Sequence, residues 1–95
     1  MSETLPSALK LRVFTSHRQL ADEDVLEVTL PSLDGYVGIF PGHRPLLVAL
    51  GDGDLSYRAA HKQESFSVSG GYAQVSPDRV MVFTEIGQDE SAGST

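Results

Sequence analysis

Cysteine is absent from this sequence, and positive charge is scarce. Without cysteine the chain has no disulfide, no thiolate nucleophile and no cysteine-ligated zinc, which fits a reducing compartment. Seven Lys and Arg residues stand against 13 Asp and Glu residues, giving a formal net charge of −6. A general nucleic-acid binder needs clustered cations to neutralise phosphates, so this balance argues against a nucleic-acid partner.

Long apolar runs are absent too. No stretch approaches the ~20 apolar residues that a helix needs to span a bilayer. The N-terminal segment MSETLPSALK lacks the basic start and the long apolar segment of a secretory signal peptide. We therefore expect a soluble intracellular domain with no direct membrane insertion. Any association with a membrane would then depend on a protein partner.

Three segments alternate between apolar and polar residues with a period of two, as in a strand with one buried and one exposed face. They are residues 9–13, 26–30 and 65–69. Residues 80–84 (VMVFT) lack clean alternation, which predicts a central strand covered on both faces. Turn-forming residues separate these runs at 31–35, 51–54, 70–71 and 76–78. Short strands spaced by turns predict an all-β fold, a small two-sheet β-sandwich.

Two segments leave the secondary structure open. Residues 44–50 (RPLLVAL) are the best helical candidate, but they are too short for an independent helix and also suit one turn that leads into a strand. Residues 17–24 (HRQLADED) indicate a polar connection with a short strand pair around Leu20. Residues 1–8 and 87–95 are small and polar, so we expect a flexible N-terminus and a disordered tail that flank one domain over residues 9–86.

Residues that could carry catalysis do not converge in the sequence. His17, His43 and His61 lie far apart, and none has a second histidine at the spacing of a zinc site. The segment GDGDLS (51–56) lacks the third glycine of a dinucleotide-binding loop and the required glycine of a calcium loop, so it predicts a hairpin turn. The acidic clusters lack the apolar surroundings that raise a carboxyl pKa for acid–base work. These observations favour a binding or structural role with no catalytic residue, cofactor or metal site.

A small β-sandwich ligand-binding module, for instance for sugars, is one alternative. Its mark would be an exposed aromatic platform built from Tyr36, Tyr57 and Tyr72.

Two longer motifs are more specific than any of these patterns. Residues 30–50 read LPSLDGYVGIFPGHRPLLVAL, and residues 64–85 read ESFSVSGGYAQVSPDRVMVFTE. In this order they resemble the epsilon subunit of the F-type ATP synthase, called delta in mitochondria, over residues 9–85. The matching positions are Gly35, Gly38, Ile39, Pro41, Gly42, His43, Pro45, Leu46 and Leu47 in the first motif, and Val68, Ser69, Gly70, Gly71, Val75, Pro77, Val80 and Val82 in the second.

The resemblance implies the β-sandwich of about ten short strands that forms the N-terminal domain of that subunit. It also implies a non-catalytic subunit at the foot of the central stalk, which binds the gamma subunit and the membrane c-ring and has indirect contact with the alpha/beta hexamer. There it would help couple proton- or sodium-driven rotation to ATP synthesis, at the cytoplasmic face of the bacterial inner membrane. The family's C-terminal helical hairpin has no counterpart in these 95 residues, so we expect no C-terminal helical domain in them, whether the hairpin is naturally absent or has been removed.

Carried over position by position, the resemblance also implies contact residues. The gamma-interface candidates are His43, Arg44, Thr15, Val48, Val82 and Glu85. The c-ring candidates are Leu33, Asp34, Gly35 and Tyr36. Tyr36 stands where acidic residues are frequent in the family, Arg44 replaces a small residue, and Val48 replaces a threonine. Asp34 can supply the charge that Tyr36 lacks.

The segment FPGHRPLL (40–47) predicts a rigid corner. Pro41 and Pro45 fix the backbone, and Gly42 permits a conformation that other residues resist. We expect this corner to hold His43 and Arg44 outward. Leu46, Leu47, Val48 and Leu50, which follow it, are expected in the core, because a small domain needs most of its apolar residues inside.

Overall fold

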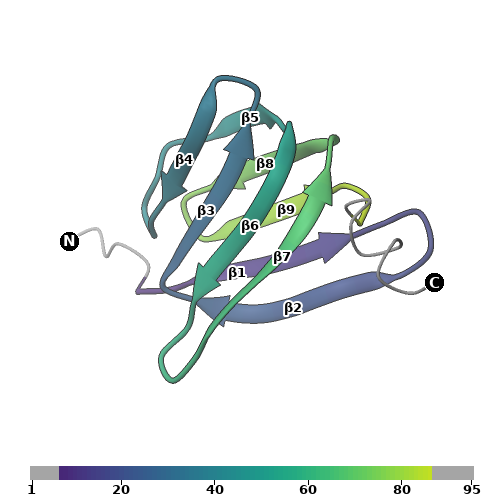
Figure 1. Ribbon diagram of the computed structural model, residues 1–95. Helices are drawn as coiled ribbons and strands as arrows, with labels where there is room; N and C mark the ends of the chain where they lie inside the picture. The colour runs from purple at the N-terminus through teal and green to yellow at the C-terminus, as the bar shows by residue number, and fades with distance from the viewer. Residues whose placement is uncertain (1–6, 87–95) are drawn as a thin grey trace.

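The computed structural model describes residues 7–86, which form nine β-strands in two stacked sheets (Figure 1). The strands are β1 Leu9–Phe14, β2 Gln19–Val25, β3 Glu27–Ser32, β4 Gly35–Ile39, β5 Leu46–Ala49, β6 Asp52–Arg58, β7 Gln63–Ser69, β8 Tyr72–Ser76 and β9 Arg79–Phe83. The expected all-β two-sheet sandwich is confirmed, with nine strands where about ten were expected. None of residues 7–86 lies in a helix, so this part of the chain contains no helix able to cross a membrane. The flexible start and disordered tail expected for residues 1–8 and 87–95 fall largely outside the described residues.

The two sheets differ in size and in strand direction. Sheet A has the strand order β2-β1-β9-β8-β5, and sheet B has the order β4-β3-β6-β7. In sheet A, β1 runs parallel to β9, which brings the first and the last strand side by side. The other neighbouring strands in both sheets are antiparallel.

The core lies between the sheets and consists of the inward-facing residues of the alternating strands. Leu9, Leu11 and Val13 of β1 are fully buried, and the residues between them are only half-buried. The same alternation places Val28 and Leu30 of β3 in the core. Each large aliphatic side chain that is fully buried contributes about 1.5–3 kcal/mol relative to an exposed one. The period-two pattern thus predicted these strands and their inward faces correctly.

Residues 17–24 are more regular than the predicted polar connection. They include most of β2, a seven-residue strand that forms one edge of sheet A. Its carboxylates lie opposite the cations of β1, with Lys10 paired to Asp24 and Arg12 paired to Asp22 in register. Ala21 and Val25 fill the alternate, buried positions. An edge strand needs only one buried face, so a polar sequence can form it.

Residues 44–50 form strand β5 and no helix, so the strand alternative is confirmed. β5 is the other edge of sheet A and pairs only with β8. Val48 and Leu50 are buried as expected, but Leu46 and Leu47 are exposed, so their predicted core position was wrong. The hairpin turn predicted at 51–54 is also wrong, since β6 begins at Asp52.

Strand β9 is central, as predicted for residues 80–84, and pairs with β1 and β8, but the predicted covering of both faces is wrong, since only the inner face is fully buried. Its alternation is hidden by the apolar character of both faces. Val80 and Val82 are fully buried in the core, whereas Met81 and Phe83 lie half-buried on the outer face of sheet A. The turn at Gly70 and Gly71 is confirmed, and both residues have positive φ, 67° and 100°.

Candidate partner-binding surface

A row of aromatic side chains crosses the outer face of sheet A. The strand register sets Phe14 of β1 beside Phe83 of β9, and Phe83 beside Tyr72 of β8. The rings of Phe14 and Phe83 stack with centroids 5.4 Å apart, and those of Phe83 and Tyr72 with centroids 5.1 Å apart. Stacked pairs at these distances stabilise each other beyond simple area burial. The next residue in the row is Ala49 of edge strand β5.

The aromatic row forms one wall of a shallow groove of about 310 Å³, here called the aromatic groove. Its lining is Phe14, Thr15, Ser16, Ser69, Gly71, Tyr72, Phe83, Thr84 and Glu85. Gly71 is required there, because a Cβ at this position would overlap the carbonyl oxygen of Phe83 and its φ of +100° disfavours other residues. An open groove with apolar walls and a polar rim suits a side chain or segment of another protein.

Thr15 and Glu85, two gamma-interface candidates, both line the aromatic groove. The Thr15 hydroxyl accepts hydrogen bonds from the backbone N–H groups of His17, at 3.1 Å, and Arg18, at 3.2 Å, and so shapes the β1–β2 turn. The backbone N–H of Ser16 donates to the Glu85 carboxylate at 3.3 Å. The parallel β1–β9 pairing therefore places Thr15 and Glu85, which lie near opposite ends of the sequence, next to each other in space.

Two other gamma-interface candidates are in the core. Val82 is 0% exposed, and Val48 is 7% exposed. Both project from the inner face of sheet A, because their neighbours Phe83 and Leu47 occupy the outer positions of β9 and β5. In the described residues, Val48 and Val82 therefore pack in the core beneath sheet A and are not part of its outer surface.

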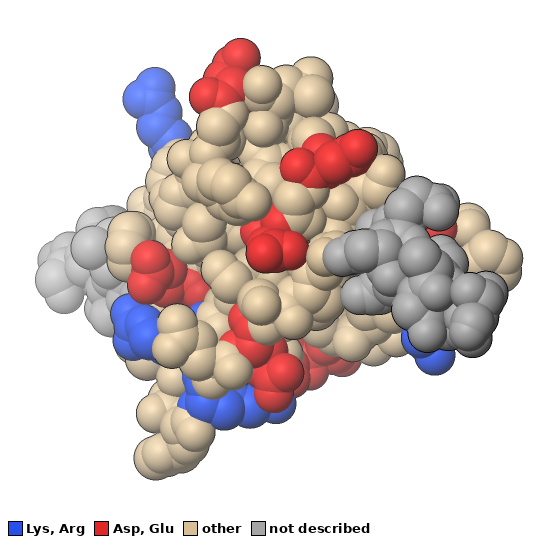
Figure 2. All heavy atoms as spheres, viewed as in Figure 1, with Lys and Arg blue, Asp and Glu red and all other residues tan. Residues whose placement is uncertain are grey.

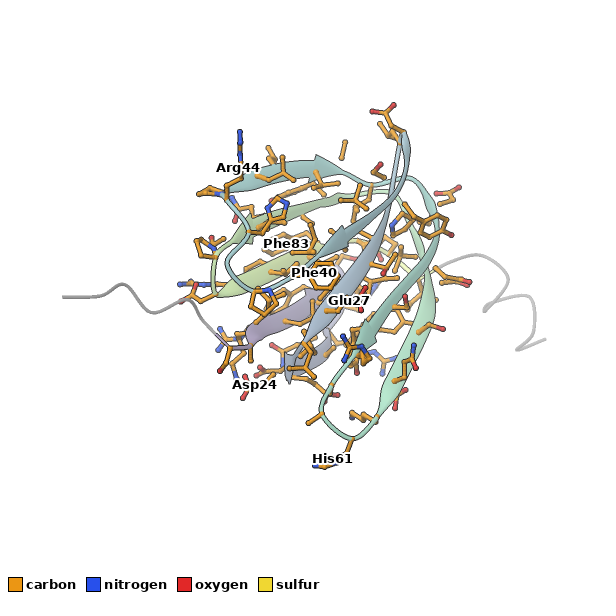
Figure 3. All side chains as sticks on the ribbon, turned by 90° about the vertical axis from the view of Figure 1, so that its left-hand side faces the viewer. Asp24, Glu27, Phe40, Arg44, His61 and Phe83 are labelled. Carbon is orange, nitrogen blue, oxygen red and sulfur yellow. The ribbon has the colours of Figure 1, made fainter. Side chains whose placement is uncertain are left out.

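His43 and Arg44 lie at a corner beyond the opposite end of sheet A. Residues 40–43 form a type II β-turn, in which the N–H of His43 donates to the carbonyl of Phe40 at 3.2 Å and Gly42 has φ of +90°. The N–H of Gly42 donates to the carbonyl of Pro77 at 2.7 Å, in the β8–β9 turn. Arg44 extends away from the molecule, as expected, whereas His43 is half-buried (Figure 3). The rigid corner predicted from the sequence is present.

The c-ring candidates form the tip of the β3–β4 hairpin. Leu33 is 71% exposed, and Asp34 and Gly35 are exposed beside it. The tip is ordered by the Ser32 hydroxyl, which donates to the Gly35 carbonyl and accepts from the N–H of Asp34. Tyr36 differs from the rest, because its hydroxyl accepts a hydrogen bond from the N–H of Asp54 at 3.2 Å, which holds it against β6.

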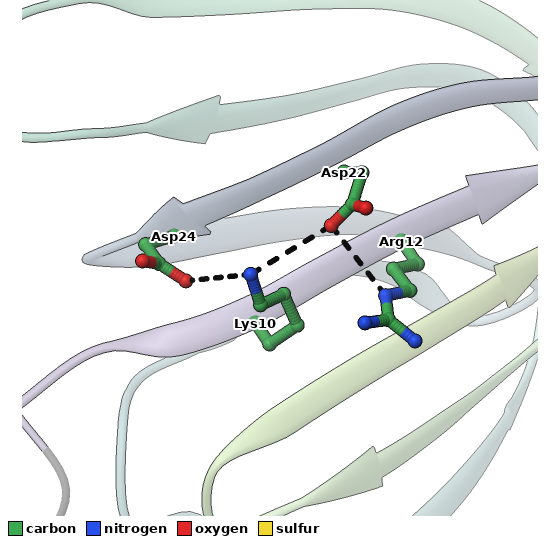
Figure 4. Close-up of polar contacts among 4 residues, drawn as sticks. All are labelled: Lys10, Arg12, Asp22 and Asp24. Carbon is green, nitrogen blue, oxygen red and sulfur yellow. Dashed lines mark hydrogen bonds and ion pairs between the residues drawn. The ribbon is translucent and has the colours of Figure 1, made fainter.

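The aromatic groove has a charged neighbour on the same sheet face. Lys10 contacts Asp24 at 3.2 Å and Asp22 at 3.7 Å, and Arg12 contacts Asp22 at 3.4 Å (Figure 4). Asp24 is largely exposed and the other three side chains are nearly half-exposed, so each pair contributes no more than about 1 kcal/mol. The outer face of sheet A therefore changes from paired charges at one end to stacked aromatics at the other.

The outer face of sheet B is hydrophilic. Exposed Asp52 and Asp54 accept hydrogen bonds from the hydroxyls of Ser69, at 3.0 Å, and Ser67, at 3.2 Å. Figure 2, which views the molecule from the side of sheet B, shows carboxylates spread over this face and no large basic patch there. The stacked row of aromatic rings lies on the outer face of sheet A, whereas Tyr36, 62% exposed on sheet B, belongs to no stacked pair.

A polar cluster joins the two sheets at the β2 edge. The Tyr57 hydroxyl and the Lys62 ammonium both donate to the Glu23 carboxylate at 2.8 Å. The hydrogen bonds from Lys62 and then Tyr57 hold the pKa of Glu23 below its ordinary value. Burial, followed by the bond to Glu23, raises the pKa of Tyr57 to about 12. The cluster has a structural explanation, and among residues 7–86 no three His, Asp or Glu side chains are grouped to hold a metal ion.

The three tyrosines of the alternative ligand platform are scattered. Tyr57 is buried, Tyr36 lies on sheet B and Tyr72 lies on sheet A. The sugar-binding alternative thereby loses its basis.

Comparison with known proteins connects this arrangement to a family. The family profile described as the β-sandwich domain of the ATP synthase delta/epsilon chain matches residues 8–88. The chain belongs to the ATP synthase delta/epsilon family.

Relatives within the delta/epsilon family carry the same name. The ATP synthase epsilon chain of Solibacter usitatus is 40% identical over 84 residues, which cover 88% of this chain and 63% of that protein. That of Dehalococcoides mccartyi is 39% identical over 77 residues, which cover 81% of this chain and 55% of that protein. The chain therefore spans roughly three fifths of the length of these relatives.

Solved structures share the delta/epsilon fold. A chain of the Euglena gracilis mitochondrial ATP synthase (OSCP/F1/c-ring) has a TM-score of 0.80 at 23% identity, covering 99% of this chain and 65% of that one. A chain from the central stalk/c-ring structure of the Tetrahymena thermophila mitochondrial ATP synthase has a TM-score of 0.68 at 19% identity, covering 86% and 66%. At these identities the likeness concerns the fold.

The aromatic groove is the part of this delta/epsilon domain that sequence reasoning missed. Phe14, Tyr72 and Phe83 are distant in sequence, and only the sheet register brings them together. A signal was present, since Phe14 and Phe83 occupy positions out of phase with the inward-facing Leu9, Leu11 and Val13 of β1 and Val80 and Val82 of β9. Of the predicted contacts, the structure unites Thr15 with Glu85 and His43 with Arg44, and it separates these two pairs along sheet A.

Proposed function

We propose that this chain is a non-catalytic subunit of the central stalk of an F-type ATP synthase. It binds the gamma subunit and the c-ring and helps couple proton- or sodium-driven rotation to ATP synthesis in the alpha/beta hexamer. Family membership supports this proposal, as do relatives that are named ATP synthase epsilon chain. In such a complex the subunit is peripheral, at the cytoplasmic face of the bacterial inner membrane.

The observation that carries the proposal is the aromatic groove on the outer face of sheet A. Its wall exposes stacked rings, with Tyr72 45% exposed, whereas the β6–β7 part of the opposite face is covered by hydroxyls and carboxylates. Thr15 and Glu85, which the resemblance assigns to gamma, form its rim. We assign this groove to gamma, with the His43–Arg44 corner as a second contact at the other end of the sheet. Tyr72 of the groove and Pro77, which bonds to Gly42 of the corner, are five residues apart along β8 and the turn after it, a span of about 17 Å that one partner segment can cover.

The c-ring contact is assigned to the tip of the β3–β4 hairpin. Leu33 and Asp34 project from it, and the N–H of Leu33 donates to the Ala49 carbonyl of β5 at 3.2 Å. The tip is thereby tied to sheet A as well as to sheet B. A rotating coupling element needs a stiff body, and a packed sandwich core with tied turns supplies that stiffness.

The test uses two exposed tyrosines on opposite faces. The whole chain is mixed with the gamma subunit encoded in the same genome, and binding is measured by size-exclusion chromatography and isothermal titration calorimetry. We expect co-elution at about 10 μM, an affinity that corresponds to about 7 kcal/mol of binding free energy. Tyr72→Ser is expected to weaken binding about tenfold or more, because exposed aromatics at an interface centre dominate its energy.

Tyr36→Ser is the matched control for the gamma surface, since Tyr36 is 62% exposed but lies on sheet B. It should leave the gamma affinity within about twofold of the unmodified chain. Folded proteins that fail to co-elute would remove the central-stalk proposal. If the two substitutions weaken gamma binding equally, the assignment of the groove to gamma would be wrong, while the central-stalk proposal would stand.

A further inference from the structure

The imidazole of His43 has a defined hydrogen-bonding state. Its Nδ1 lies 2.7 Å from the backbone carbonyl oxygen of Arg44. A carbonyl oxygen only accepts hydrogen bonds, so Nδ1 must carry the hydrogen and donate it. In a neutral ring with hydrogen on Nδ1, the other nitrogen, Nε2, is an unprotonated acceptor.

Nε2 of His43 is open to a partner. No hydrogen bond joins it to any of residues 7–86. Every buried side-chain nitrogen or oxygen among these residues has a hydrogen-bond partner. Because Nε2 has none, it is not buried and is accessible from solvent. The ring is half-buried and held by its Nδ1 bond to the Arg44 carbonyl, and the backbone of its turn is anchored through Gly42 to Pro77. The result is a single acceptor atom, held in a fixed direction at the corner.

Arg44 adds a cation next to this acceptor. Most other cations of the described part of the chain form ion pairs with Asp or Glu, as Lys10, Arg12, Arg58 and Lys62 do. The Arg44 side chain extends into solvent, and no carboxylate within residues 7–86 is paired with it (Figure 3). The corner therefore offers an acceptor and a free positive charge together.

We propose that Nε2 of His43 accepts a hydrogen bond from an N–H or O–H donor of gamma, and that Arg44 pairs with a carboxylate beside that donor. This inference rests on the proposed function and specifies the chemistry of one contact. His43 acts as a specificity element, because a partner that presents an acceptor to Nε2 would leave both groups unsatisfied.

The first test needs no partner. Long-range ¹H–¹⁵N correlation spectra of the ¹⁵N-labelled chain at pH 8 report which ring nitrogen carries hydrogen. We expect the Nδ1–H form for His43. The exposed His61 at the tip of the β6–β7 loop is the internal reference for an unconstrained ring (Figure 3). An Nε2–H form for His43 would overturn the assignment, whatever the gamma experiments give.

The second test measures gamma affinity for two variants at His43. His43→Phe keeps the ring and removes the acceptor, and we expect binding about fivefold to tenfold weaker. His43→Gln places an amide oxygen near the position of Nε2 and should recover most of that loss. His61→Phe and His61→Gln are the matched controls and should bind like the unmodified chain. Thermal unfolding of each variant separates a loss of contact from a loss of fold.

Arg44→Gln tests the second half of the contact. We expect weaker binding at low salt and a shallower salt dependence, because one exposed ion pair has been removed.

The outcomes of these tests can be told apart. Suppose that the Nδ1–H form is present and that the unmodified chain binds gamma. An unchanged gamma affinity of His43→Phe would then overturn the acceptor role and leave the proposed function standing. No binding by the unmodified chain would remove both, while the tautomer result would still describe the free domain.

Discussion

Phe14 and Phe83 stack across the only parallel strand pair in the described part of the chain, with ring centroids 5.4 Å apart and an interplanar angle of 15°. They come from the first and the last strand of the domain. Their contact joins these two strands in the middle of sheet A and also forms part of the wall of the aromatic groove. Stability and partner binding therefore depend on the same pair of rings.

Phe14→Ala is expected to lower the free energy of unfolding by about 1–2 kcal/mol, since it removes a half-buried ring and one stacking contact. Urea unfolding followed by circular dichroism measures the change. Leu47→Ala is the control on the same sheet face, because Leu47 is 65% exposed and has little to lose. A larger loss in Leu47→Ala than in Phe14→Ala would contradict the role of the stack.

Gly71→Ala should cost about 2–3 kcal/mol, because the new Cβ would meet the Phe83 carbonyl and the backbone has a φ of +100°. Gly70→Ala is the neighbour control. Gly70 also has positive φ, at 67°, but a Cβ there would have no atom within 4 Å. We expect it to cost only about 1 kcal/mol. Thermal and urea unfolding give both values, and equal losses would show that the close approach to β9 is unimportant.

The Tyr57 phenol should make the domain sensitive to alkali. Its pKa in the folded chain is raised to about 12 by burial and by the bond to Glu23. Between the ordinary tyrosine pKa of about 10 and this value, the unfolded chain releases the proton and the folded chain keeps it. Stability should therefore fall with rising pH, by up to about 1.4 kcal/mol per pH unit from this group.

Tyr57→Phe tests the origin of that alkaline slope. The variant should show a smaller fall in urea-unfolding free energy between about pH 10 and pH 12. Part of the slope will remain, because the bond to Glu23 also raises the pKa of Lys62. A slope that is identical in both chains would contradict the assignment to Tyr57.

Asp22→Asn is expected to cost less than about 1 kcal/mol, although Asp22 contacts both Lys10 and Arg12. Exposed pairs are screened by salt, so the difference from the unmodified chain should vanish near 1 M NaCl. Chemical unfolding in urea at two salt concentrations measures this. A loss that persists at high salt would indicate a packing contribution from the Asp22 side chain.

Leu33→Ser distinguishes a role of the hairpin tip in c-ring binding from a role in the stability of the fold. Leu33 is 71% exposed, so the free energy of unfolding should change by less than about 0.5 kcal/mol. If the tip contacts the c-ring, the complex of this chain with gamma should bind detergent-solubilised c-ring more weakly when it carries the substitution. Val37→Ser, at a half-buried position of β4, is the contrasting variant that should lose stability instead.

Much of the site was out of reach of sequence reasoning for one physical reason. Local patterns report which face of a strand is buried, but not which strands become neighbours. The parallel β1–β9 pairing decides that Thr15 meets the region of Glu85 and that Phe14 meets Phe83. Val82 and Val48 are a different case, because they matched family contact positions but project into the core.

By itself, the sequence determined the all-β class, the inward faces of β1 and β3, and the proline- and glycine-built corner at residues 40–43, because alternation and turn chemistry are local. The motifs at 30–50 and 64–85 also sufficed to indicate the delta/epsilon family. The tertiary structure alone decided that β2 is a regular edge strand, that Leu46 and Leu47 are exposed, and that three distant aromatics line one groove. Each of these depends on strand order and register, which arise from packing the whole chain at once.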